Sequence, residues 1–172
     1  MAVDFHDEAP SGLLAGGPGF HYVPFGSWHD LPDRYDAIFL RHVLEHHPDP
    51  LRLLAGLCRK LLPNGRLYIE VPNRHSVWAS VFRRAYVGYY LPRHLMHFSA
   101  ASLRKLVESS GLECLSVKLG HTPLIGRSLG YLTGTDMQNT GLVGLASYPL
   151  QVAVDVVAGA SSTLRATAAL RV

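Results

Sequence analysis

Short apolar runs alternate along the chain with segments of helical periodicity. Five of these runs are brief and bounded by turn residues, as buried strands are: MAVDF (1–5), GFHYVPF (19–25), YDAIFL (35–40), RLYIEV (66–71) and LECLSVKL (112–119). The last segment, STLRATAALRV, alternates at period two and predicts an edge strand that closes the sheet. This order predicts one α/β domain over residues 1–172, built around a largely parallel sheet.

Two segments between these runs predict helices. The first follows Asp49 and Pro50, an N-cap and first-turn pair, and LPNG at 62–65 is expected to end it. Its expected apolar face comprises Leu51, Leu54, Cys58 and Leu61. The second is expected to begin at the N-cap Ser99 and to end at Gly111, with an apolar face of Leu103, Leu106 and Val107.

Charge and cysteine content narrow the class of protein. The net charge is +3, but the 16 Lys and Arg residues are scattered, without the dense basic stripe that would indicate nucleic-acid binding. Cys58 and Cys114 stand alone in separate apolar segments, which indicates buried free thiols in a reducing compartment rather than a disulfide framework. The N-terminus lacks the pattern of a signal peptide, so we expect a cytoplasmic protein.

Residues 120–160 form an expected insertion before the last strand. Its apolar part, GLVGLASYPLQVAVDVVAGA at 141–160, is interrupted by Pro149, Gln151 and Asp155. These residues argue against a membrane span and for a helix that is buried or docks on a surface. Peripheral membrane contact through 141–160 is therefore an open expectation.

The decapeptide RHVLEHHPDP at 41–50 concentrates three histidines and a glutamate. His42, Glu45 and His46 match H-x-x-E-H, the pattern of a class of zinc peptidases, and a zinc hydrolase is one alternative function. That motif requires a sustained helix, which Pro48 and Pro50 would end almost at once. A preceding strand instead places the cluster at the carboxyl edge of a sheet, where ligands bind in open α/β folds.

Two longer stretches carry a resemblance to a known family. DAIFLRHVLEHHPDPLRLLAGLCRKLLPNGRLYIEVPN (36–73) and LPRHLMHFSAASLRKLVESSGL (91–112) resemble class I S-adenosylmethionine-dependent methyltransferases, most of all the branch of quinone-biosynthesis O-methyltransferases. The resemblance implies a Rossmann-like sheet, mostly parallel with an antiparallel C-terminal strand. No glycine-rich G-x-G element precedes Asp4, so we expect the first strand-helix unit to be missing and the chain to be N-terminally truncated.

The same resemblance implies an S-adenosylmethionine site drawn from three places in the chain. The implied cofactor-binding residues are Asp4, Phe5, Ser27, Trp28, Arg41 and His42. Asp4 corresponds to the acid that bonds ribose, the GSWHDLP loop to the adenine cradle, and Arg41 with His42 to the border of the methionine moiety. A solvated acid, a core tryptophan and a surface arginine are the structural alternatives.

The cluster also offers a metal site and a base. Glu45 and His46 resemble a divalent-metal pair in some relatives, and His42 with His94 or His97 would complete a set that favours a transition metal over Mg²⁺. The alternative is that Glu45 caps backbone amides and His46 packs at the turn. His46 and His94, with an ordinary pKa of about 6.5, are the candidate catalytic bases for a hydroxyl acceptor.

Residues 74–98 mix aromatic and arginine residues, which predicts an amphipathic lid over an aromatic, lipid-like or anionic substrate, or alternatively an aromatic face packed on the core. The function that follows is S-adenosylmethionine-dependent O-methylation of a small-molecule acceptor of quinone, lipid or sugar type. The alternative is a catalytically inactive methyltransferase-like remnant that serves as a binding module.

Overall fold

The computed structural model describes residues 2–4, 22–24, 34–135 and 141–171. The chain divides into two compact units, 1–34 and 35–172. In the first unit, strands β1 (Ala2–Asp4) and β2 (Tyr22–Pro24) pair in parallel, within two of the predicted apolar runs. Asp4 is the last residue of β1, whereas Phe5, Ser27 and Trp28 lie outside the described residues.

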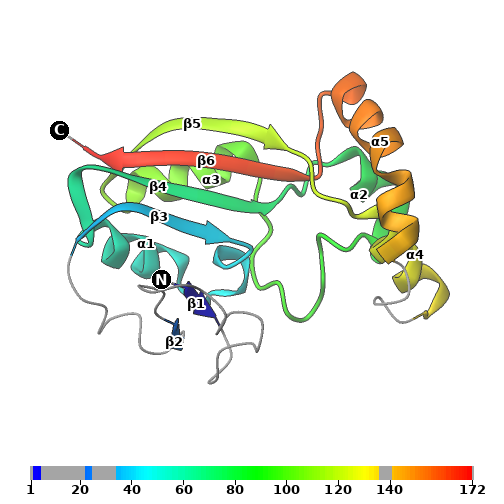
Figure 1. Ribbon diagram of the computed structural model, residues 1–172, viewed down its shortest axis with the longest axis horizontal. Helices are drawn as coiled ribbons and strands as arrows, with labels where there is room; N and C mark the ends of the chain where they lie inside the picture. The colour runs from blue at the N-terminus through cyan, green and yellow to red at the C-terminus, as the bar shows by residue number, and fades with distance from the viewer. Residues whose placement is uncertain (1, 5–21, 25–33, 136–140, 172) are drawn as a thin grey trace. The chain divides into compact units, whose positions relative to one another are not determined.

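The second unit contains a four-stranded sheet in the order β3-β4-β6-β5 (Figure 1). Its strands are β3 (Tyr35–Arg41), β4 (Leu61–Pro72), β5 (Leu112–Gly120) and β6 (Thr163–Leu170). β3 and β4 are parallel, and β6 runs antiparallel to both β4 and β5. The predicted α/β fold with an antiparallel C-terminal strand is therefore confirmed.

The predicted place of the last strand is wrong. β6 lies between β4 and β5 and is not an edge strand of this sheet. Leu164, Ala166 and Ala168 are fully or almost fully buried, and on the other face Ala169 is buried as well. The central position of β6 follows from the pairing, because both edges of the strand are hydrogen-bonded, one to β4 and the other to β5. Period-two alternation fixes which residues share a face but not which strands pair.

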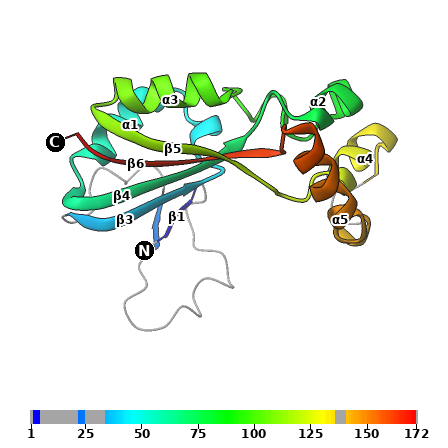
Figure 2. The ribbon, with the colours of Figure 1, turned by 90° about the horizontal axis from the view of Figure 1, so that it is seen from above.

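Helices α1 (Pro50–Cys58) and α3 (Ala100–Ser109) lie on the same face of the sheet (Figure 2). Both predicted caps are confirmed: Asp49 accepts a hydrogen bond from the Arg52 amide, and Ser99 accepts one from the Ser102 amide. Gly111, with φ +91°, follows α3 in the left-handed conformation that glycine adopts at low cost.

The predicted boundaries and apolar face of α1 need correction. The buried side of α1 comprises Pro50, Leu53, Leu54 and Leu57, whereas Leu51 is 42% exposed. The helix ends at Cys58, and the LPNG sequence belongs to the start of β4. Gly65 approaches β3 so closely that a Cβ atom would lie 2.8 Å from the Tyr35 carbonyl oxygen. The glycine therefore permits strand contact rather than ending a helix.

A second, smaller core lies at one end of the sheet. It joins α2 (Val77–Phe82), η3 (Arg83–Ala85), α4 (Ile125–Thr133) and α5 (Gly141–Ala158), all of which extend beyond the strands in Figures 1 and 2. Its buried residues are Trp78, Ala79, Tyr86, Leu124 and Ile125. The aromatic segment 74–98 thus packs against the segment 120–160.

Candidate functional site

The histidine cluster lies at the carboxyl end of β3. The strand ends at Arg41, His42 has a positive φ of 53°, and a single 3₁₀ turn, η2 (Leu44–His46), follows. His42 and His46 consequently do not share a helix, so the geometry of the H-x-x-E-H zinc peptidases is absent from this turn. The backbone instead delivers the cluster to the edge of the sheet, as the strand before it predicts.

Glu45 is a fully buried carboxylate at the centre of the cluster. Its Oε1 atom lies 3.1 Å from Nδ1 of His42, whereas Oε2 has no hydrogen-bond partner among the described residues. The Glu45 backbone carbonyl accepts hydrogen bonds from the amides of Leu95 and Met96. The backbone carbonyl of Glu45, and not its carboxylate, therefore holds the 74–98 segment in place. The buried Oε2 atom of the carboxylate is thus available for a ligand.

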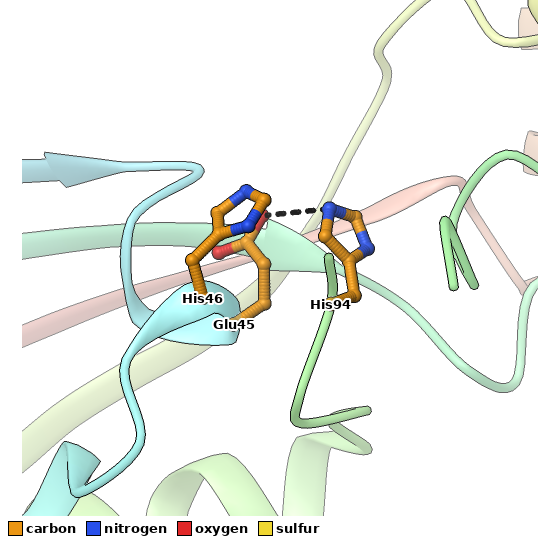
Figure 3. A group of neighbouring side chains, drawn as sticks. All are labelled: Glu45, His46 and His94. Atoms are coloured by element: carbon orange, nitrogen blue, oxygen red, sulfur yellow. Dashed lines mark ion pairs between the residues drawn. The ribbon is translucent and has the colours of Figure 1, made fainter. Parts of the chain in front are cut away.

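Glu45 and His46 project from the turn after β3, and His94 reaches them from the 74–98 segment (Figure 3). Their rings are edge to face with centroids 4.6 Å apart. Nδ1 of His46 lies 3.0 Å from the Arg93 carbonyl, and Nδ1 of His94 lies 2.9 Å from the Gly88 carbonyl. Because a carbonyl only accepts, each Nδ1 carries the proton, and in the neutral rings Nε2 carries the lone pair.

Burial lowers the pKa of His94 below its ordinary value of 6.5, and the hydrogen bond to Gly88 and the nearby Glu45 carboxylate only partly oppose this effect. The side chain of His94 is only 8% exposed. A lowered pKa keeps the ring neutral near pH 7. His94 can therefore accept a proton or bind a metal ion at Nε2.

The cluster opens into a cavity of about 480 Å³ between the edge of the sheet, the 74–98 segment and the start of α4. Histidines, aromatic rings and an arginine line it, among them His42, His46, Tyr86, Tyr90, His94 and Arg127. The Tyr86 hydroxyl donates to the Asn73 carbonyl, and burial raises its pKa well above the ordinary value. Tyr86 is therefore a neutral wall of the cavity, not a base.

Three side chains form a group that could hold a metal ion. The ligand atoms of Glu45, His46 and His94 lie within 4.8 Å of one another. The partnerless Glu45 oxygen and the carbonyl-bonded Nδ1 atoms, which orient both rings, fit a divalent cation. His97, an alternative ligand in the sequence prediction, bonds to the Tyr89 carbonyl and stands outside this group.

Sequence reasoning missed Glu70 near the end of β4. Its Oε1 atom lies 3.7 Å from Nε2 of His42 and accepts a hydrogen bond from Thr122, and its Oε2 atom pairs with Arg165 at 2.9 Å. The side chain of Arg41 is 71% exposed and reaches Glu70 only at 3.9 Å. An acid near the end of the RLYIEV run was the available signal, since period two places it opposite the buried residues.

Comparison with known proteins identifies the family. Residues 2–117 match the family model of a methyltransferase domain. The chain belongs to this methyltransferase family. It is 29% identical over 87 residues to the ubiquinone biosynthesis O-methyltransferase of Aeromonas salmonicida, a match that covers 47% of this chain and 37% of the relative. The corresponding enzyme of Xanthomonas oryzae is 32% identical over 66 residues, covering 37% and 28% of the two chains.

Solved structures agree on the fold. A SAM-dependent methyltransferase from Archaeoglobus fulgidus superposes with a TM-score of 0.59 at 17% identity, covering 96% of this chain and 73% of that one. A possible histamine N-methyltransferase from Thermotoga maritima gives 0.56 at 16% identity, covering 89% and 65%. The methyltransferase domain described here therefore has the Rossmann-like fold of class I S-adenosylmethionine-dependent enzymes. It spans about a third of the length of the curated relatives it matches.

Proposed function

We propose that this methyltransferase transfers a methyl group from S-adenosylmethionine to a hydroxyl group of a small quinone-, lipid- or sugar-like acceptor. The observation that carries this proposal is the cavity at the carboxyl edge of the sheet, whose lining combines three imidazoles with tyrosine rings. Its size falls within the range of small-molecule sites, about 300–1,000 Å³. The curated relatives are ubiquinone biosynthesis O-methyltransferases, which supports a quinone-like acceptor among these three.

The described residues are compatible with the cofactor. Arg41 and His42 directly follow β3, and His42 lines the cavity, so the end of this strand would border the methionine moiety. Asp4, at the end of β1, remains the proposed ribose ligand. Bound S-adenosylmethionine would supply a methyl group already activated on a sulfonium. The protein is then left to align the acceptor and to remove its proton.

His94 is the proposed general base. Its Nε2 atom would take the hydroxyl proton of the acceptor as the oxygen bonds to the methyl carbon and the carbon-sulfur bond breaks. The lowered pKa keeps this nitrogen unprotonated near neutral pH. His46, in edge contact with His94 and also at the cavity, is the second candidate for this role.

The arrangement of Glu45, His46 and His94 supports a second role for the two histidines, which is to bind a metal ion. Glu45, His46 and His94 would hold a divalent cation, and two imidazoles with one carboxylate favour a transition metal such as Zn²⁺ or Fe²⁺ over Mg²⁺. The Nε2 lone pair of His94 can accept a proton or bind a metal ion, but it cannot do both at once. Activity that survives a chelator would assign His94 as the base, and activity lost to the chelator would assign it as a ligand.

The deciding test is calorimetric titration of the full chain with S-adenosylmethionine, followed by transfer of a labelled methyl group to catechol, quinol and sugar acceptors. We expect cofactor binding, and His94→Gln should lower kcat while the cofactor Kd stays unchanged. His97→Gln is the matched control, because His97 also bonds to a lid carbonyl but lies outside the cluster. A protein that binds no cofactor would instead support the binding-module alternative.

A further inference from the structure

Helix α5 is polar toward the protein and apolar toward the outside. Gly144, Gln151 and Asp155 are its buried residues. The opposite side exposes an apolar face that comprises Leu142, Leu145, Leu150, Val156 and Val157, each at least 64% exposed. In the part of the chain that the structure describes, α5 is the one helix long and apolar enough to cross a membrane, yet only 17% of it is buried. It is therefore not a core helix.

Hydrogen bonds of two buried polar side chains hold α5 with its apolar face outward. The Gln151 side chain accepts a hydrogen bond from the Leu124 amide and donates one to the Thr122 carbonyl. Asp155 accepts from the indole nitrogen of Trp78 at 2.8 Å, and its other oxygen lies 2.9 Å from Nδ1 of His121. Spanning a bilayer would break these buried bonds, each of which is costly to lose in hydrocarbon. The bonds fix α5 on the domain with the apolar face outward.

The apolar surface continues toward the cavity. α4 packs against α5 and exposes Tyr131 and Leu132. The Tyr131 ring meets the ring of Tyr90 edge to face at 6.0 Å, and Tyr90 lines the cavity. An amphiphile held against α5 would consequently lie close to the cavity mouth.

The exposed charges that the structure describes in this region have one sign. Among the described residues of 74–98 and 120–160, the exposed charged side chains are all cationic: Arg74, Arg83, Arg84, Arg93 and Arg127. Asp155 is the acid described there, and it is fully buried. The 74–98 and 120–160 segments pack together, so the apolar helix face and the exposed arginines occur at the same end of the sheet. This combination complements an anionic lipid surface, where each cation near the headgroups adds to binding.

We propose that α5 docks this protein on an anionic membrane surface, lying in the plane of the headgroups with its apolar face inserted. The lid arginines would then contact the lipid phosphates. This inference stands apart from methyl transfer, since it rests on the apolar face of α5 and on the exposed arginines of the same end of the sheet. The arginines favour lipid over a second copy of the chain, because two copies would bring like charges together.

Vesicle co-sedimentation of the full chain tests the proposal. The probes are vesicles of phosphatidylcholine alone and of phosphatidylcholine mixed with phosphatidylglycerol. We expect binding to the mixed vesicles that weakens with added salt, and a loss of roughly tenfold or more in the variant Leu142→Asn/Leu145→Asn/Val157→Asn. The matched control is Leu51→Asn/Leu115→Asn, which removes exposed leucines from α1 and β5.

Two further measurements test whether the variants fold and whether a second copy of the chain, rather than lipid, covers the apolar face of α5. Circular dichroism should give the same melting curve for wild type and triple variant, and the single variant Val157→Asn, at an 89% exposed site, repeats the test with the least perturbation. Wild-type protein that stays in the supernatant with both vesicle types would overturn the proposal. So would a dimer that dissociates in the triple variant while vesicle binding is unchanged.

Discussion

The Nε2 atom of His94 lies 3.9 Å from the Oε1 atom of Glu45, although the two residues come from different segments of the chain. Glu45 belongs to the turn after β3, and His94 to the 74–98 segment (Figure 3). The backbone carbonyl of Glu45 also accepts amide hydrogen bonds from Leu95 and Met96. The edge of the sheet and the 74–98 segment therefore meet at Glu45, so a substitution of Glu45 or of His94 should alter both segments.

The first prediction concerns metal binding. Wild-type protein titrated with Co²⁺ should bind one ion, because Glu45, His46 and His94 place three ligand atoms within 4.8 Å. Glu45→Gln and His94→Gln should each weaken binding by about tenfold or more, since each removes or weakens one ligand. Visible absorption of Co²⁺ reports both its binding and its coordination geometry.

His97→Gln is the control for this titration, because His97 bonds to the Tyr89 carbonyl and is not one of the three ligands. Its affinity for Co²⁺ should match the wild type. If all three variants bind the ion as the wild type does, the cluster is not its site.

The second prediction concerns pH. Burial lowers the pKa of His94 in the folded state below the ordinary value of 6.5, so the unfolded state binds more protons in that range. The stability contributed by neutral His94 is present above pH 6.5 and is lost as the pH falls through the folded pKa. Urea unfolding of metal-free protein from pH 8 to pH 5 should show this decline.

His94→Gln keeps a donor for the Gly88 carbonyl but does not titrate. The free energy of unfolding of this variant should fall less between pH 8 and pH 5 than that of the wild type. If the free energy of unfolding falls equally with pH in both proteins, a group other than His94 causes the loss of stability at low pH.

Local signals in the sequence predicted the strands and caps well. β3, β4 and β5 contain the expected apolar runs, and the caps Asp49 and Ser99 are where the residue types place them. Caps and strands depend on neighbouring residues, so a short window contains the information. The central position of β6 depends on pairing between segments about ninety residues apart, as Glu70 with Arg165 shows, and no local period encodes that.

In the candidate site, too, the sequence predicted what depends on neighbouring residues and missed what depends on distant segments. The sequence predicted Glu45 and His46 at the edge of a sheet and named His94 as a candidate base and metal ligand, and the structure brings the three together. Choosing between His94 and His97 required the fold, because both lie in the 74–98 segment. The structure shows that His94 bonds to the Gly88 carbonyl within the three-residue group, whereas His97 bonds to the Tyr89 carbonyl outside it. Glu70 was missed because its role comes from Thr122 and Arg165, which reach it from distant segments.

The third prediction tests the cap of α3. Ser99→Ala removes the acceptor for the Ser102 amide and one half of the reciprocal capping box, so it should destabilise the protein by about 1 kcal/mol. Ser109→Ala, at an exposed position of the same helix, should change the free energy of unfolding by less than about 0.5 kcal/mol. Chemical denaturation at pH 7 measures the free energy of unfolding of both variants. Equal changes would show that the Ser99 cap does not stabilise α3.

The fourth prediction concerns the buried carboxylate that anchors α5. Asp155→Ala leaves the Trp78 indole nitrogen and His121 without their acceptor, and we expect a loss of about 2–4 kcal/mol in the free energy of unfolding. Asp155→Asn retains an oxygen for Trp78 and should cost clearly less. Denaturation followed by tryptophan fluorescence measures both variants. Equal losses would show that the charge of Asp155, rather than its hydrogen bond to Trp78, holds α5 against the domain.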